Sequence, residues 1–106
     1  MENLRQFKRV VIDLGGELMI EHKAFQVDVK DISLGGAYIE SKVNLKMNEE
    51  VELRIFLSAV EHVVEVSGRI AWLKGEIGFG IAFKELKPID VWALMRQTQT
   101  ENAEAF

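Results

Sequence analysis

Alternating apolar and polar residues recur along most of this chain, and such a period of two predicts half-buried antiparallel strands. The expected strands lie, in chain order, at residues 10–14, 18–20, 25–29, 37–40, 51–57, 63–73 and 77–83. Gly15-Gly16 separates the first two, and we expect a bulge or a bend there rather than a reversal, because the alternation resumes at once. The pattern therefore predicts six or seven short strands.

A single helix is expected after the last of these strands. Pro88 marks its start, because proline is tolerated at the first position of a helix. Val91, Leu94 and Met95 fall on one face at helical spacing, so they are expected to pack against the rest of the protein. The helix is expected to fade over residues 98–106, where the chain offers little to bury.

Strands followed by one helix indicate a small all-β domain with a C-terminal helix. Closure into an antiparallel barrel would remove exposed sheet edges, and a sandwich of two sheets is the alternative that the pattern leaves open. We place the domain, with an N-terminal arm and the helix, at residues 1–98 and a polar tail at residues 99–106. Trp72 and Phe79 are expected in the core, whereas Trp92 is expected to be half-exposed.

The composition fits one soluble globular domain and narrows its chemistry. The chain has 106 residues, of which 48% are hydrophobic and 28% charged, enough to bury one core. It has no cysteine, which excludes disulfides, thiol catalysis and thiolate zinc sites and fits a cytoplasmic location. The formal net charge of −4 argues against DNA, RNA or an anionic membrane surface as a partner. No apolar run reaches the roughly 20 residues that membrane insertion requires.

Neither a metal site nor a catalytic site can be assembled from the sequence. The two histidines, His22 and His62, have no second histidine or carboxylate at ligand spacing. Ser33 and Ser67 have no histidine near them in sequence, so a nucleophile with its base is not indicated. We therefore expect a protein that is not an enzyme and that needs no cofactor.

Local positive charge is concentrated at the start of the chain, at Arg5, Lys8 and Arg9. Arg5 and Arg9 stand four residues apart, so they share a side in an extended segment and in a helix alike. A guanidinium is planar and permanently charged, and it binds phosphate or the O6/N7 edge of guanine with paired hydrogen bonds. The pair therefore fits a compact anion, and a solvated charged segment before the first strand is the alternative.

A second group of polar and small residues closes the strand that begins near residue 25. Asp31 and Ser33 continue the parity of the buried face of that strand, so their side chains are expected to point toward the core side. An ionised carboxylate offers paired acceptors for the N1–H and the N2 amino group of guanine, and a serine adds a small donor and acceptor. Gly35 and Gly36 let a ligand approach the backbone without meeting a Cβ. The alternative is a turn in which the glycines supply positive φ.

Together, the two groups resemble the signature of the PilZ domain, the bacterial receptor module for cyclic di-GMP. Residues 5–9 read RxxxR and residues 31–36 read [D/N]xSxxG, about one hairpin apart. The resemblance extends over nearly the whole chain, through residues 51–55, 68–72 and 77–83 and the closing helix. It implies a six-stranded antiparallel β-barrel with a C-terminal helix.

The resemblance also implies a role for each residue of the two motifs. Arg5 and Arg9 would grip phosphates and guanine edges. Asp31 and Ser33 would read guanine on the barrel surface, next to the backbone of Gly35-Gly36. These roles come from the family pattern and not from the spacing of the residues.

By the same resemblance, the protein would be a signalling receptor. Cyclic di-GMP would fold a flexible arm against the barrel and change the surface that a protein partner, or a second copy in a homodimer, recognises. The expected processes are bacterial motility, adhesion or biofilm formation. Leu4 stands where some relatives carry a further arginine, so one ligand per domain is expected rather than an intercalated pair.

Two other functions compete with this one. A β-barrel adaptor for protein–protein interaction that binds no nucleotide is the first, and the intact arginines with Asp31 and Ser33 argue against it. A binder of single-stranded nucleic acid is the second, and the acidic net charge and the expected scarcity of surface aromatic residues argue against it.

Overall fold

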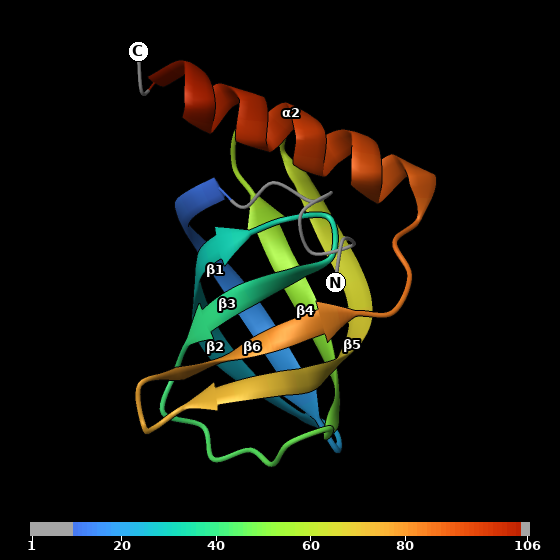
Figure 1. Cartoon of the computed structure of the whole chain (residues 1–106). Helices are drawn as coiled ribbons and strands as arrows, with labels where there is room; N and C mark the ends of the chain where they lie inside the picture. The colour runs from blue at the N-terminus through green and yellow to red at the C-terminus, as the bar shows by residue number, and fades with distance from the viewer. Residues whose placement is uncertain (1–9, 105–106) are drawn as a thin grey trace.

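Within residues 10–104, six strands and one helix make up the fold (Figure 1). The structure is a computed structural model that describes residues 10–104, with side chains as far as residue 99. The strands are β1 (Val10–Ile20), β2 (Lys23–Ile32), β3 (Gly36–Glu40), β4 (Glu50–Leu57), β5 (His62–Lys74) and β6 (Gly78–Phe83), and the helix is α2 (Pro88–Glu104).

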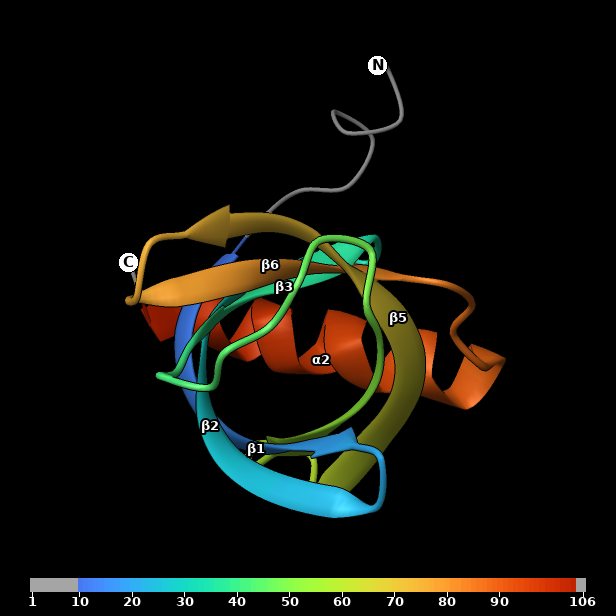
Figure 2. The ribbon, with the colours of Figure 1, turned by 90° about the horizontal axis from the view of Figure 1, so that it is seen from below.

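The strands close into one barrel in the order β1-β2-β3-β6-β5-β4. Every neighbouring pair is antiparallel, including the pair of β1 with β4 that completes the ring. The ring is visible in Figure 2, where α2 lies behind it. The expected six-stranded barrel with a C-terminal helix is therefore confirmed, and the sandwich of two sheets is excluded.

The interior of the barrel is filled by the apolar residues of the alternating strands. In β4 the alternation is strict: Val51, Leu53, Ile55 and Leu57 are buried, and the residues between them are exposed. Phe79 of β6 joins them in the core, as expected. Because burial of apolar surface is the main favourable term in folding, this shared interior holds the six strands together.

β1 runs without interruption through Gly15 and Gly16. The expectation that the chain does not reverse there is confirmed, but the irregularity lies earlier, where the register with β2 shifts between Val11 and Leu14. Gly16 instead permits a close approach of two strands, because a Cβ on it would lie 2.8 Å from the carbonyl oxygen of Arg54. The ladder between β1 and β4 starts at this glycine.

A one-residue irregularity in β5 decides the position of Trp72. The register with β6 shifts between Ile70 and Trp72. Such a shift reverses which residues face inward, so Trp72 lies on the outer wall and is 41% exposed. The expectation that Trp72 lies in the core is therefore wrong.

α2 lies across one end of the barrel (Figure 1). Its buried face consists of Asp90, Ala93, Leu94 and Gln97. Met95, which was expected on this face, is 49% exposed, and Trp92 is 53% exposed, as expected. The helix also continues to Glu104, beyond residue 98 where it was expected to fade. Within the described residues, no helix is long and apolar enough to span a membrane.

Candidate functional site

Asp31 lies on the outer wall of the barrel, near the end of β2. It pairs with Val11 of β1 and with Tyr38 of β3, and Val11 is 82% exposed. Residues that lie directly opposite each other in antiparallel strands project to the same face, so the Asp31 side chain faces outward. The expectation that it points to the core side is wrong, because the register of β2 with β3 shifts after Val29 and brings Ile32, fully buried, into the core instead.

Ser33 organises the short connection between β2 and β3. Its backbone N–H donates to the carbonyl oxygen of Gly36 at 2.9 Å, which closes the turn. Its hydroxyl oxygen accepts a hydrogen bond from the N–H of Gly35 at 3.1 Å. The hydroxyl also lies 3.5 Å from the Gly36 carbonyl oxygen, longer than an ordinary O–H···O hydrogen bond. Ser33 therefore stabilises the turn and keeps its own proton largely uncommitted.

Gly36 is required by the packing of β3 against β6. A Cβ on Gly36 would collide with the carbonyl oxygen of Ile81. Positive φ is not the reason for the glycine pair, since Gly75 is the one glycine within residues 10–104 that has it. Phe83 donates its N–H to the carbonyl oxygen of Gly35 at 2.9 Å, which fastens the same turn to β6. The turn at residues 33–36 is thus held by a hydrogen bond within the turn and by another from β6.

Arg5 and Arg9 lie outside the described residues. The first described residue, Val10, pairs with Ile32 in the ladder between β1 and β2. Val10, the first residue of β1, therefore lies one strand spacing, about 4.8 Å, from Ile32, the residue before Ser33. Of the six predicted site residues, the structure brings Asp31, Ser33, Gly35 and Gly36 together at the entry of β1.

A lateral row of outward-facing residues extends from this entry across four further strands. The ladders pair its members successively from β1 to β5: Val11, Asp31, Tyr38, Gly80 and Trp72. The rings of Tyr38 and Trp72 are stacked, with centroids 5.3 Å apart and planes 14° apart. A Cβ on Gly80 would collide with the Trp72 ring, so the glycine makes room for the indole. The exposed ring of Trp72 therefore lies on the same wall as Asp31, with Tyr38 and Gly80 between them in the row.

Tyr38 is the buried member of this aromatic pair. Its side chain is covered by Trp72, and the ammonium of Lys74 lies 5.4 Å from the ring centroid. Burial raises the pKa of Tyr38, and the neighbouring carboxylates of Glu40 and Asp31 raise it further. Tyr38 therefore remains neutral near pH 7, and its ring stacks against one face of the Trp72 indole.

Sequence reasoning did not predict that Tyr38 and Trp72 stack on the same wall of the barrel as Asp31. The signal was present in β6, where Gly78 and Gly80 alternate with large apolar residues. Glycines on the outer face of a strand indicate that a neighbouring side chain or a ligand lies over that strand. Here Tyr38 lies over Gly78 and Trp72 lies over Gly80.

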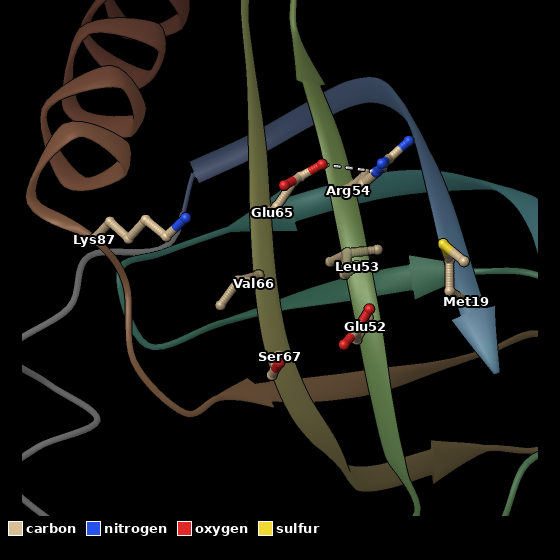
Figure 3. Close-up of a pocket in the computed structure, with 8 residues that line it drawn as sticks. All are labelled: Met19, Glu52, Leu53, Arg54, Glu65, Val66, Ser67 and Lys87. Carbon is tan, nitrogen blue, oxygen red and sulfur yellow. Dashed lines mark ion pairs between the residues drawn. The ribbon is translucent and has the colours of Figure 1, made fainter. Parts of the chain in front are cut away.

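A separate hollow of about 310 Å³ lies on another wall of the barrel (Figure 3). It is lined by Met19, Glu52, Leu53, Arg54, Glu65, Val66, Ser67 and Lys87. Arg54 bonds Glu65 at 2.9 Å and lies 3.5 Å from Glu17, so its charge is already compensated. Asp31, Ser33, Gly35 and Gly36, the motif residues that the structure describes, do not line this hollow, and we do not assign the site to it. No group of residues in the described part of the chain is arranged to hold a metal ion.

Comparison with known families assigns most of the chain to one of them. The PilZ domain family matches residues 3–98, a range that includes both motifs and ends within α2. Among curated proteins, none matches the chain.

Several solved structures have the same fold as this chain. The inhibitor of motility MotI/DgrA of Bacillus subtilis is 19% identical, with a TM-score of 0.82, over 94% of this chain and 52% of its own. The PilZ domain of YcgR from Escherichia coli, solved with c-di-GMP, is 11% identical, with a TM-score of 0.73, over 95% of both chains. PlzA of Borreliella burgdorferi, solved in complex with c-di-GMP, is 18% identical, with a TM-score of 0.63, over 92% of this chain and 43% of its own. The chain thus spans about half the length of MotI and of PlzA.

Proposed function

This chain belongs to the PilZ domain family, and on that premise we propose that it is a receptor for cyclic di-GMP. The observation that carries the proposal is the pairing of Val10 and Val11 with Ile32 and Asp31. It places the entry of β1, one residue after the RxxxR motif ends at Arg9, beside the second motif. In this proposal the two motifs, which are separate in sequence, bind one ligand at this surface.

Asp31 is the guanine-reading group in this proposal. Its carboxylate faces outward at the end of β2 and can accept hydrogen bonds from the N1–H and the N2 amino group of a guanine. Ser33 assists Asp31. Its hydroxyl oxygen accepts a hydrogen bond from the N–H of Gly35, and its hydroxyl proton can still be donated to the ligand. Gly35 presents no Cβ at the turn, so a ligand can approach its backbone closely.

Arg5 and Arg9 supply the positive charge for the phosphates in this proposal. Cyclic di-GMP carries two phosphates, and paired guanidinium–phosphate hydrogen bonds are among the strongest polar contacts in proteins. In this proposal each arginine binds a phosphate or a guanine edge while Asp31 binds the base. One ligand molecule per domain remains our expectation, because Leu4 offers no further charge.

Trp72 adds a stacking surface to the same wall. One face of its indole is covered by Tyr38, and the side chain remains 41% exposed. Stacking of a base on an aromatic ring contributes about 1–3 kcal/mol. We therefore include Trp72 in the ligand surface, at the far end of the row that begins with Val11 and Asp31.

The response to the ligand is a change of surface and not a chemical reaction. Binding would bring the arginines against the barrel wall, because the two motifs then share one ligand. A protein partner in the cytoplasm would recognise the altered surface. Control of motility is the favoured process, because MotI is named for it; adhesion and biofilm formation are the others.

Calorimetric titration of the full chain with cyclic di-GMP tests the proposal, with GTP and a short oligonucleotide as controls. We expect binding near the micromolar range, about −8 kcal/mol, and no comparable heat from either control. A folded protein that gives no heat with cyclic di-GMP would leave the adaptor that binds no nucleotide as the better description. Equal binding of the oligonucleotide would favour a nucleic-acid binder.

A further inference from the structure

Arg69 of β5 lies on the same outer wall as the proposed site. It pairs with Ala82 of β6, and Ala82 pairs in turn with Gly36, the last residue of the turn at residues 33–36. Gly68 and Ile70 on either side of Arg69 are buried, so its exposed side chain points away from the core. Neighbouring strands are about 4.8 Å apart, which puts the Cα atoms of Arg69 and Gly36 about 10 Å apart. Between them the row offers only the methyl group of Ala82, and a long arginine side chain covers most of that distance.

The irregularity in β5 brings Arg69 and Trp72 to the same face of the sheet. Three residues apart on a regular strand, they would point to opposite faces. The register with β6 shifts between Ile70 and Trp72, and Trp72 is consequently exposed on the outer wall. Tyr38 stacks against the indole and fixes it there. An arginine and a surface on which a base can stack therefore lie next to each other along β5.

The guanidinium of Arg69 makes no ion pair within the described part of the chain. The residue directly opposite Arg69 in β4 is acidic, Glu50. Glu50 Oε1 lies 3.2 Å from Nζ of Lys84 instead. Arg54, by contrast, bonds Glu65 at 2.9 Å on the wall of the hollow. Arg69 therefore keeps its hydrogen-bond donors available for a ligand.

Cyclic di-GMP carries two identical guanines, and this wall offers two different groups that can read them. Asp31 can accept hydrogen bonds from the N1–H and the N2 amino group of one guanine. Trp72 lies three strands further along the row, about 14 Å from Asp31 by strand spacing, so a single guanine cannot use both. A second guanine stacked on Trp72 would present its edge to Arg69. Paired hydrogen bonds from arginine to O6 and N7 are the commonest specific contact with guanine.

We propose that Arg69 is a further ligand-binding residue of this site and donates paired hydrogen bonds to O6 and N7 of the guanine that stacks on Trp72. The inference rests on the proposed function as a receptor for cyclic di-GMP. The two halves of a symmetrical ligand are then read by different edges, one by Asp31 and the other by Arg69. Adenine carries an amino donor in place of O6, so it cannot accept both hydrogen bonds from a guanidinium. Arg69 therefore makes the second base position selective for guanine.

Calorimetric titration of the full chain with cyclic di-GMP and with cyclic GMP–AMP, in which one guanine is replaced by adenine, tests this assignment. The remaining guanine can still bind Asp31, which leaves the adenine for Arg69. We expect the unchanged protein to bind cyclic di-GMP about tenfold more tightly than cyclic GMP–AMP, the size of one paired arginine–guanine contact. Arg69→Gln should remove or reverse this preference, because glutamine pairs with N6 and N7 of adenine. A purely structural role of Arg69 would instead weaken the binding of both dinucleotides alike.

Two further variants serve as controls. Arg69→Ala removes the contact without offering a new one, so it should weaken cyclic di-GMP binding about tenfold and change cyclic GMP–AMP binding little. Arg54→Gln removes the same charge from the wall of the hollow and should keep the preference of the unchanged protein. Equal affinity of the unchanged protein for the two dinucleotides, or a preference that survives in Arg69→Gln and Arg69→Ala, overturns the role of Arg69 alone. A protein that binds no cyclic di-GMP overturns the proposed function, and this inference with it.

Discussion

Asp31 of β2 lies directly opposite Val11 of β1, and this pair joins the two halves of the proposed ligand site. Both side chains face the outside of the barrel, and the turn that follows Asp31 is fastened by Ser33 to Gly36 and by Gly35 to Phe83. One half of the site is therefore built into the barrel wall. The other half, Arg5 and Arg9, precedes β1 by sequence and is assigned by proposal.

Replacement of the carboxylate of Asp31 should weaken ligand binding without unfolding the protein. We expect Asp31→Ala to cost about 1–3 kcal/mol of cyclic di-GMP binding, because charge-assisted hydrogen bonds to guanine are lost. The matched control is Asp28→Ala, which removes an exposed carboxylate from the same strand. Calorimetry should show normal affinity for Asp28→Ala. Unchanged affinity of Asp31→Ala, or equal losses in both variants, would show that Asp31 makes no specific contact with guanine.

Arg9 should contribute to binding and not to stability. We expect Arg9→Ala to weaken cyclic di-GMP binding by roughly 1–3 kcal/mol through loss of a charge-assisted contact, with the melting temperature of the free protein nearly unchanged. Lys8→Ala is the control, because Lys8 carries a charge but occupies no motif position. A large drop in melting temperature without ligand would show instead that Arg9 is structural.

Trp72 should report ligand binding through its fluorescence. A guanine that stacks on the exposed indole face should quench this emission and contribute about 1–3 kcal/mol, so Trp72→Ala should bind more weakly and Trp72→Phe should recover part of the loss. The measurement is best made in a Trp92→Phe background, which leaves one tryptophan. Unchanged emission and unchanged affinity would exclude Trp72 from the ligand surface.

Gly36 should be needed for folding before it is needed for binding. A Cβ would meet the carbonyl oxygen of Ile81, so we expect Gly36→Ala to lower the free energy of unfolding by about 1–3 kcal/mol. Gly15→Ala is the matched control, because the nearest atom to its Cβ would be Cδ2 of Phe56, at an ordinary 3.7 Å. Urea denaturation of the two variants gives their free energies of unfolding for comparison. Equal stability of the two variants would contradict the close packing of β3 on β6.

The alternation of apolar residues predicted the barrel strands well where the register is regular. β4 is the clearest case, since its buried and exposed residues alternate as the sequence does. The errors at Asp31 and Trp72 have one physical cause. A single extra residue in β2 and another in β5 reverse the alternation, and a bulge of this kind leaves no trace in an apolar–polar pattern. Both reversals place their residues on the outer wall to which we assign the proposed site.

The helix was harder to predict because its partners are distant in sequence. Asp90 and Gln97 read as surface residues, yet His62 and Ala59 satisfy their polar groups and allow them to be buried. Such partners are 28 and 38 residues away, so no local pattern reveals them. The alternating period identifies strands, whereas the rotation of α2 depends on individual hydrogen bonds.

The most direct test of the central claim is a map of backbone amide chemical shifts during titration of the full chain with cyclic di-GMP. The account predicts shifts concentrated at residues 5–9 and 31–36 and at the indole N–H of Trp72. Residues around the hollow near Arg54 and Glu65 should shift little. Shifts confined to that hollow, or none at saturating ligand, would contradict the claim that the two motifs form one ligand site.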